Sequence, residues 1–457
     1  MMPPPVMTLN KNSATMNEPP MTFQRTGSIP TQEASGHGRG EWGQAALALV
    51  AAFGAYFCMY GLRKPFTAAS YDGAEAFGIG LKPALVTSQV LGYTLSKFIG
   101  IRVVSEMHPR WRAAALAALV LAAEGALLAF AVVPRPWNVV CLFVNGLPLG
   151  MVFGLVLAPL EGRRLTELLT AGLCASFILA GGVMKSTGAW LLAVGVSEKW
   201  MPAAAGAIYL IPLVAFTVML HAVKPPSAED RAARSERRPM NRHDRRNFLA
   251  RYGGVVMAVV VVYVLANVIR NLRDDFAPEI WRALGVTAAP AVFTQTEVLV
   301  AGGVLVASGA AVWIQDNRRG FAFSLAVCGT GFTLLAAAIL AQTAGLVNGF
   351  TFMVLTGLGL SLPYVAIHTT VFERLLAMTR EPGTIGFLMY VADAFGYLAY
   401  VGLMLGGSLL SQRTDALTLF TAASWISISV SLIALAAVWW WRPMPSTVRV
   451  RPPPSQA

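Results

Sequence analysis

Eight ionisable residues lie inside long apolar stretches of this sequence, where charged groups are rare. They are Arg63, Lys64, Lys97, Glu124, Lys185, Arg270, Glu297 and Asp393, with Arg102, Arg273, Asp274 and Asp275 nearer to the ends of such stretches. A charged side chain at bilayer depth costs at least about 2.5 kcal/mol on insertion scales, so the groups found there usually face a cavity or a partner. Because cations outnumber anions in the set of eight, these residues favour the binding of an anion.

Arg63 and Arg270 occupy matching positions in the two halves of the chain. Each follows the start of a long apolar run by a similar interval, the runs beginning near residues 43 and 253. Two planar guanidinium groups that face one another suit a phosphate or a carboxylate, so we predict that they clamp an anion. Lys64, Lys97 and Lys185 would add positive charge. The alternative is that each arginine extends to the lipid headgroups.

The aromatic and acidic residues of the same stretches complete the predicted site. Tyr60 and Tyr93 are expected to contact the substrate through hydrogen bonds or ring stacking. We expect Glu297, Asp393 and Asp275 to form ion pairs that balance the cations, with Glu297 or Asp393 holding a clamp arginine when the site is empty.

Two further titratable residues have alternative interpretations. Glu124 lies in the middle of an apolar run, and we interpret it as a structural ion-pair partner, with a proton carrier as the alternative. His368 is the single histidine deep in such a run, and we interpret it as packing rather than as a proton relay.

The apolar stretches that carry these residues are long and numerous enough to cross a membrane. The chain has 457 residues, of which 56% are hydrophobic and 13% charged, whereas a soluble domain has about 25% charged residues. Apolar runs begin near residues 43, 84, 113, 138, 166, 202, 253, 291, 321, 346, 384 and 416, and a span needs roughly 20 apolar residues. We therefore expect an all-α membrane protein of about twelve transmembrane helices in two six-helix halves.

Polar segments divide the chain into five parts. We predict a disordered tail over 1–40, a first half over 41–223, a basic linker over 224–251, a second half over 252–441 and a proline-rich tail over 442–457. Lysine and arginine concentrate in the loops on the linker side, so the linker and both termini are predicted to be cytoplasmic. Two such halves in the same orientation are typical of a parallel-repeat transporter.

Several functions are excluded by composition and by the absence of motifs. The net charge of +12 is spread over short loops, which does not favour nucleic-acid binding. All four cysteines lie in apolar runs without metal-ligand spacing, so no metal or other cofactor is expected. No nucleophile elbow, phosphate-binding lysine loop or paired metal histidines occur in the sequence, which argues against an enzyme.

Four segments resemble the organophosphate:inorganic phosphate antiporter branch of the major facilitator superfamily, which includes the glycerol-3-phosphate and hexose-phosphate transporters. They are YFCMYGLRKPFTAA, GYTLSKFIGIRVVSEMHPRWR, NVIRNLRDDFAPEIW and TEVLVAGGVL. The resemblance implies a major facilitator fold and places Arg63 at the family's first phosphate-binding arginine. It also matches Lys97 to a family lysine, and Glu106 and Arg110 to a cytoplasmic loop motif in which Glu106 replaces aspartate.

Departures limit what this resemblance implies about the substrate. The family's histidine after Cys-Ala is replaced here by Ser176, with Lys185 nearby, and Phe276 replaces a tryptophan. The resemblance therefore implies the fold and the anion clamp rather than a named sugar phosphate. The segment YFCMYGLRKPFTAA also resembles an uncharacterised bacterial subfamily.

These observations lead to one predicted function and two alternatives. We expect a secondary transporter in the bacterial inner membrane, acting as a monomer, that moves a small organic anion, most simply a phosphorylated one. The coupling ion, phosphate or a proton, stays open. The alternatives are a transport-inactive sensor of an external anion and a polytopic membrane enzyme.

Overall fold

The computed structural model describes residues 34–157, 159–160, 166–224, 242–286, 289–314, 316–379, 385–410 and 415–440. The first part contains α1 (Ala34–Met59), η1 (Tyr60–Leu62), η2 (Pro65–Ala68), β1 (Glu75–Ala76), β2 (Ile79–Gly80), α2 (Leu81–Glu106), α3 (Pro109–Val132), α4 (Asn138–Leu157), α5 (Thr166–Ala193) and α6 (Met201–His221). The second part contains α8 (Arg242–Asp275), α9 (Ala277–Ala283), α10 (Ala291–Val312), α11 (Asn317–Thr343), α12 (Gly349–Ala366), η3 (Ile367–Val371), α13 (Phe372–Thr379), α14 (Ile385–Leu410) and α15 (Ala416–Trp440).

The helices account for the predicted membrane spans. Within the described residues, nine helices are long and apolar enough to cross a membrane. Of two shorter apolar segments, Ala46–Leu62 belongs to α1 and η1, and Val391–Gly406 belongs to α14. Helix α2 has 26 residues but carries Lys82 and Lys97 along its length. Together these segments match the predicted runs one by one, so the prediction of an all-helical multi-pass membrane protein is confirmed.

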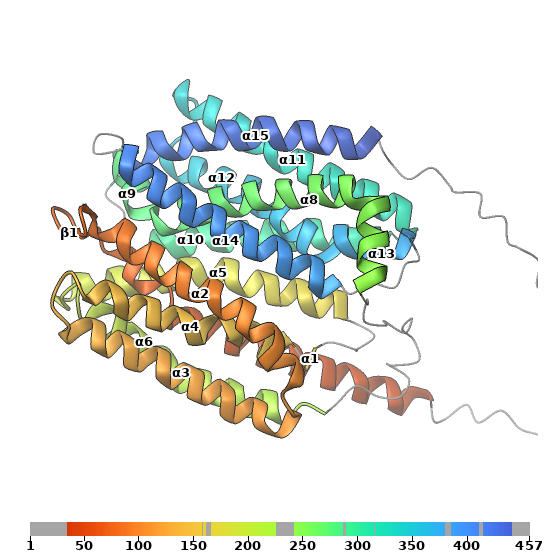
Figure 1. The fold of residues 1–457 in the computed structure, drawn as a ribbon, viewed down its shortest axis with the longest axis horizontal. Coiled ribbons are helices and arrows are strands. Elements are labelled where there is room, and N and C mark those ends of the chain that lie inside the picture. Colours follow the sequence, from red (N-terminus) through yellow and green to blue (C-terminus); the bar gives the residue numbers. More distant parts are fainter. Residues whose placement is uncertain are drawn as a thin grey trace, which may run out of the picture. The chain divides into compact units, whose positions relative to one another are not determined.

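The helices form two groups that meet along two helix pairs. We call α1 to α6 from Gly43 onward the first helix group, and α8 to α15 the second helix group. In Figure 1, α3, α4 and α6 lie in the lower part of the view, and α8, α11, α12 and α15 lie in the upper part. Helix α2 packs against α14 and α5 packs against α10, so these four helices form the boundary between the groups.

Glycines allow α4 to approach α2 closely, which positions the residues that α2 contributes to the boundary. A Cβ atom at Gly146 would lie 2.2 Å from the carbonyl oxygen of Gln89, and one at Gly150 would lie 2.6 Å from that of Tyr93. Small residues at such spacing allow transmembrane helices to pack backbone to backbone. Tyr93 and Lys97 therefore lie on a helix whose backbone packs closely against α4.

The two ends of the helix bundle carry different short elements. One end, the α9 end, carries α9 and the hairpin of β1 and β2, and the other, the α13 end, carries α13 and the start of α8 (Figure 1). The hairpin is antiparallel, pairing Ala76 with Ile79. Phe77 and Gly78 turn the chain at φ values of 55° and 78°, as a two-residue hairpin turn requires.

The observed boundaries differ from the predicted division of the chain at two places. Helix α1 begins at Ala34, inside the predicted 1–40 tail, and α8 begins at Arg242, inside the predicted 224–251 linker. Residues 1–33 of the predicted N-terminal tail, residues 225–241 of the linker and the 442–457 tail lie outside the described residues. All contacts described below lie within one compact unit that starts at Gly43.

Candidate anion-binding site between the helix groups

Arg63 lies where the first span stops being a regular helix. Helix α1 gives way to the 3₁₀ turn η1, and Pro65 starts a second 3₁₀ turn, η2. A proline ring prevents the helix from continuing and leaves carbonyl groups without their usual partners, which must be satisfied inside a membrane. Asn145 donates to the carbonyl of Leu62 at 3.2 Å, and Gln89 donates to that of Arg63 at 3.1 Å. Polar side chains of α2 and α4 thus fix the backbone that carries Arg63.

The guanidinium group of Arg63 is held by aromatic rings. Its central carbon lies 4.1 Å from the ring centroid of Tyr93, 5.4 Å from that of Tyr60 and 5.9 Å from that of Tyr397. One nitrogen lies 3.4 Å from the Tyr60 hydroxyl. The side chain is 3% exposed. Tyrosine faces attract a cation without neutralising it, so Arg63 keeps its full charge in a buried position.

Arg270 has a similar environment in the second helix group. It lies on α8, with its central carbon 4.2 Å from the Tyr364 ring and 5.8 Å from the Phe177 ring. It donates to the side-chain oxygen of Asn267 at 3.4 Å, and its Nε atom has no hydrogen-bond partner. This guanidinium group therefore has an N–H donor that is free to bind a ligand.

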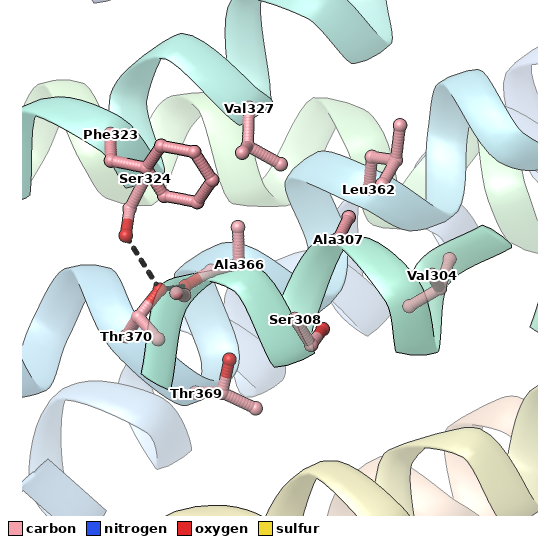
Figure 2. A pocket seen from close by; sticks show the side chains of 11 residues that line it. Val304, Ala307, Ser308, Phe323, Ser324, Val327, Leu362, Ala366, Thr369 and Thr370 are labelled. Atoms are coloured by element: carbon pink, nitrogen blue, oxygen red, sulfur yellow. Dashed lines mark hydrogen bonds between the residues drawn. The ribbon is translucent and has the colours of Figure 1, made fainter. Parts of the chain in front are cut away.

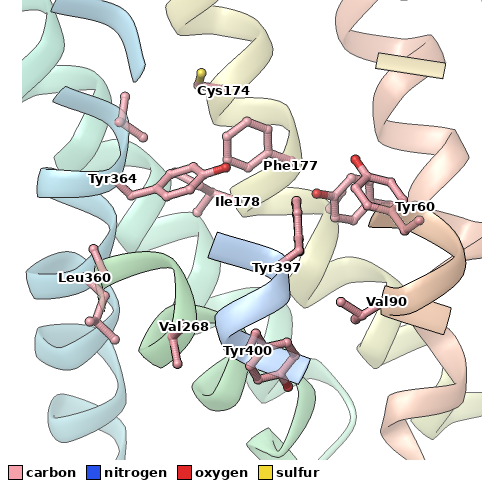
Figure 3. Close-up of a cluster of buried hydrophobic side chains, with 14 of the residues drawn as sticks. Tyr60, Val90, Cys174, Phe177, Ile178, Val268, Leu360, Tyr364, Tyr397 and Tyr400 are labelled. Carbon is pink, nitrogen blue, oxygen red and sulfur yellow. The ribbon is translucent and has the colours of Figure 1, made fainter. Parts of the chain in front are cut away.

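A chain of aromatic rings connects the two arginines across the boundary. Tyr60 contacts Tyr56, Tyr56 contacts Phe177, and Phe177 contacts Tyr364, with ring centroids 5.5, 6.4 and 5.7 Å apart. Figure 3 shows Tyr397 of α14 between Tyr60 on one side and the pair of Phe177 and Tyr364 on the other. Tyr397 also contacts Tyr93, the ring nearest to Arg63, with ring centroids 5.1 Å apart. The two arginines therefore converge on one aromatic region.

Two similar sets of residues join the helix groups on either side of this region. Lys64 forms an ion pair with Asp275 at 2.5 Å, and Tyr400 donates to the same carboxylate at 2.9 Å. We call Lys64, Asp275 and Tyr400 the α9-end triad.

The second set repeats this arrangement with the roles of α8 and α14 exchanged. Lys97 of α2 forms an ion pair with Asp393 of α14, and Tyr263 of α8 donates to that carboxylate. We call Lys97, Asp393 and Tyr263 the α13-end triad. Arg270 follows Tyr263 by seven residues and precedes Asp275 by five on α8, which corresponds to about 10 Å and about 7 Å along the helix axis. The arginine therefore lies at a depth between the two triads.

Further ion pairs neutralise other buried cations. Asp274 pairs with Lys64 at 2.7 Å and also with Lys185. Lys82 pairs with Glu279 at 2.6 Å, and Arg273 pairs with Glu297 at 2.8 Å. Among the described residues, Arg63 and Arg270 form no ion pair. The conformation therefore has two buried or half-buried arginines whose charge no carboxylate balances at contact distance.

The predicted partners of several residues need correction. Either Glu297 or Asp393 was expected to hold a clamp arginine, but in this conformation Glu297 pairs with Arg273 and Asp393 pairs with Lys97. The hypothesis fails because a carboxylate pairs with the cation that its helix depth brings closest. Lys64, Lys97 and Lys185 are likewise engaged with carboxylates in this conformation, whereas Tyr60 and Tyr93 contact Arg63 as part of the site.

Glu124 does not form the predicted ion pair. It is 7% exposed, and its Oε2 atom has no hydrogen-bond partner. The carboxyl group points at α6, where a Cβ atom at Gly206 would lie 2.0 Å from Oε2. No cation of the described chain pairs with it, because the facing surface of α6 is apolar.

The loop motif lies outside the site. The side chain of Glu106 falls outside the described residues. Arg110 is exposed near the start of α3, its guanidinium carbon 5.5 Å from the Trp111 ring. Arg110 does not contact the region around Arg63 and Arg270, and the structure does not test the predicted role of the motif.

A separate cavity occurs within the second helix group (Figure 2). Helices α10, α11 and α12 and the segment η3 line it with apolar side chains and the hydroxyls of Ser308, Ser324, Thr369 and Thr370. Ser324 and Thr370 hydrogen-bond to one another at 2.8 Å. No charged residue lines this cavity, so it does not provide a site for an anion.

Residues that were not singled out from the sequence complete the site. Asn145, Tyr263 and Tyr400 all make hydrogen bonds that fix functional residues. Asn145 gives a detectable signal, because an amide inside a highly apolar span needs a partner. Tyr263 and Tyr400 give no such signal, since tyrosine is common in spans as a packing residue.

Comparison with solved structures identifies the fold. A D-xylose–proton symporter aligns with a TM-score of 0.56 and 15% identity over 86% of this chain and 96% of the symporter. The partially occluded inward-open xylose transporter XylE from E. coli aligns with a TM-score of 0.55 and 14% identity over 87% of this chain and 99% of its own. XylE bound to 6-bromo-6-deoxy-D-glucose, described as a major facilitator superfamily proton:xylose symporter, aligns with a TM-score of 0.54 and 13% identity over 88% of this chain and 97% of its own. The predicted major facilitator fold is confirmed.

Comparison with known sequences defines the family without assigning an activity. No curated protein matches the chain significantly. The model of a family of unknown function matches residues 65–442, a range that includes all but the first residues of the candidate site. The resemblance to the organophosphate antiporter branch is not confirmed by these comparisons. The chain belongs to the family of unknown function DUF5690.

Proposed function

We propose that this protein is a secondary active transporter of a small organic anion, bound between Arg63 and Arg270 and moved by alternating access. The observation that carries the proposal is the distribution of charge. Lys64, Lys97 and Lys185 each have a carboxylate partner, whereas the two arginines have none among the described residues. Burying a charge without a partner raises the free energy of the folded protein, and binding of an oppositely charged ligand offsets this cost.

The charge of the two arginines indicates the charge of the substrate. Two guanidinium groups carry a charge of +2, which a dianion balances. A phosphate monoester carries about −1.5 to −2 charge at pH 7 and presents several acceptor oxygens to guanidinium donors. We therefore propose a phosphorylated organic anion. The structural neighbours named above are described with sugars, but a neutral sugar would leave both charges uncompensated.

The positions of the ion pairs support alternating access. The α9-end triad and the α13-end triad each join the first helix group to the second, on opposite sides of Arg270. Rocking of the two helix groups would break the contacts of one triad and keep those of the other, which opens the anion site to one side of the membrane at a time. We further propose that the protein acts as a monomer in the bacterial inner membrane with its α13 end in the cytoplasm.

Transport into proteoliposomes tests this function. We expect purified protein to take up a labelled phosphate monoester but not xylose, and Arg63→Ala and Arg270→Ala to abolish the uptake. Arg282→Ala is the control, because the Arg282 side chain is 62% exposed and contacts the exposed Asp72 and the hydroxyl of Ser70 rather than the aromatic region around Arg63 and Arg270. Uptake of xylose without anion uptake, or equal anion uptake by all variants, would refute the proposal.

A further inference from the structure

The α9-end triad belongs to a larger ion-pair network than the α13-end triad does. Lys64 pairs with both Asp274 and Asp275, and Lys185 pairs with Asp274, so among the described residues two lysines and two carboxylates are linked at this end. In the α13-end triad, Asp393 has Lys97 alone as an ion-pair partner among the described residues. Movement of Lys97 would therefore leave Asp393 without a cation at contact distance.

A histidine with a free nitrogen lies beside the α13-end triad. The His368 ring stacks on Tyr263, which hydrogen-bonds to Asp393, with ring centroids 5.6 Å apart. It also stacks on Tyr364 at 5.4 Å, and it is 5% exposed with no hydrogen-bond partner for Nδ1. It lies in the π-helical segment η3, and such segments are frequent at functional sites. An imidazole nitrogen without a partner is able to accept and pass on a proton.

The same aromatic rings contact this triad and the two arginines. The Lys97 Nζ atom lies 5.3 Å from the Tyr93 ring and 5.1 Å from the Tyr397 ring, the rings that hold Arg63. On the other side, Tyr364 contacts both His368 and Arg270. An anion bound at the arginines would therefore lie near Lys97 and attract it.

Asp393 is surrounded by groups from every neighbouring element. Lys97 of α2 and Tyr263 of α8 contact Asp393 directly, and His368 of η3 and Tyr364 of α12 stack on Tyr263. Arg270 of α8 contacts Tyr364, and Cys174 of α5 is the remaining titratable group of this region. Lys97 is the one lysine in this set, and Asp393 is its one carboxyl group. When Lys97 turns away, Asp393 has no second carboxyl group in the set with which to share a proton.

We propose that Asp393 is a proton-binding site coupled to the anion site, an inference that rests on the proposed function. Anion binding draws Lys97 from Asp393, and the carboxylate, left alone in a low-dielectric interior, binds a proton. The proton arrives through His368: an N–H bond on the imidazolium breaks, an O–H bond on Asp393 forms, and solvent returns a proton to His368. One proton is thereby carried with each anion.

Infrared spectroscopy of the full-length protein tests the proton site without any ligand. Relative to wild type, Lys97→Ala should gain a C=O band of a protonated carboxyl group at neutral pH, and the double variant Lys97→Ala/Asp393→Asn should lack this added band. Lys185→Ala is the matched control, because Asp274 and Asp275 both keep Lys64 and no new band is expected. Absence of the band in Lys97→Ala, or its persistence in the double variant, would overturn the inference.

Proton uptake on anion binding tests the coupling in the unmodified protein. Inorganic sulfate is the probe, because it remains a dianion throughout the neutral range and brings no titration of its own. In weakly buffered detergent solution, wild type should take up about one proton per bound sulfate, and Asp393→Asn should bind sulfate without proton uptake. Sulfate binding to wild type without proton uptake would overturn the coupling. Failure of wild type to bind any anion would refute the proposed function instead, and the infrared result would still decide the role of Asp393.

Discussion

Replacement of Arg270 by alanine is the sharpest test of the candidate site. The Nε atom of Arg270 has no hydrogen-bond partner, and the guanidinium group makes one 3.4 Å hydrogen bond to Asn267 and contacts the rings of Phe177 and Tyr364. The substitution therefore removes a ligand group while breaking no ion pair among the described residues. The protein should fold without the arginine, and loss of binding should not reflect loss of structure.

The magnitude follows from the energy of one buried charged contact. Truncating one partner of a buried, hydrogen-bonded charge pair costs about 2–5 kcal/mol, and each 1.4 kcal/mol is about tenfold in affinity. We expect Arg270→Ala to weaken anion binding by about 30-fold to about 3,000-fold. At an anion concentration of about 100 times the wild-type Kd, ligand stabilisation is about 2.7 kcal/mol. For the variant it should fall below about 0.9 kcal/mol at the same concentration.

Thermal unfolding of detergent-purified protein is the assay. Wild type, Arg270→Ala and the exposed control Arg282→Ala are compared with and without a phosphate monoester, a dicarboxylate and xylose. Wild type and Arg282→Ala should gain the same stabilisation from the anion, and Arg270→Ala should gain little. If Arg270→Ala is stabilised as much as wild type, Arg270 is structural and the anion clamp is refuted.

Three further predictions concern the surrounding structure. Lys97→Ala should destabilise the protein by about 3–5 kcal/mol, because it leaves the buried Asp393 without its cation. Adding Asp393→Asn should restore most of the lost stability, as measured by thermal unfolding. Equal stability of the single and double variants would contradict the ion pair. Gly146→Val should prevent α2 from packing on α4, because its Cβ would lie 2.2 Å from the Gln89 carbonyl oxygen, and should abolish folded yield in size-exclusion chromatography, whereas wild-type yield would contradict the close approach. Asp415 caps the start of α15, and hydrogen bonds from Thr418 lower the pKa of its carboxyl group. The stabilisation by this cap is therefore present above the unfolded-state pKa and is lost as the pH falls through the folded-state pKa. Asp415→Ala should cost about 0.5–2 kcal/mol of stability at neutral pH and less in acid, and an effect that does not change with pH would contradict this.

The membrane spans could be predicted because hydropathy is a local property. A run of roughly 20 apolar residues is long enough to cross a bilayer whatever the rest of the chain does. The ends of the spans were less predictable. Helix α8 continues into the polar segment as far back as Arg242, because a helix can extend beyond the apolar core into water without penalty.

The identity of the candidate site residues was also accessible from the sequence. A charged side chain in an apolar run is costly wherever the run lies, so Arg63, Lys97, Arg270 and Asp393 stood out by type and position. The partners that these residues contact could not be identified in the same way. Lys97 and Asp393 are 296 residues apart, and the hydrogen bond from Tyr263 joins a third helix to them. Nothing local to α2 specifies which carboxylate of α14 or α8 reaches the lysine.

The sequence by itself determined that this protein is a helical membrane protein in two halves with an excess of buried cations, because apolar length and charge placement follow from residue type alone. The tertiary structure decided which cations are neutralised and which stay unpaired. That outcome depends on the depth and facing of α2, α8 and α14 against one another, since an ion pair forms only where side chains from different helices come within a few ångström. The unpaired charges of Arg63 and Arg270, on which the proposed function depends, are therefore a property of packing rather than of composition.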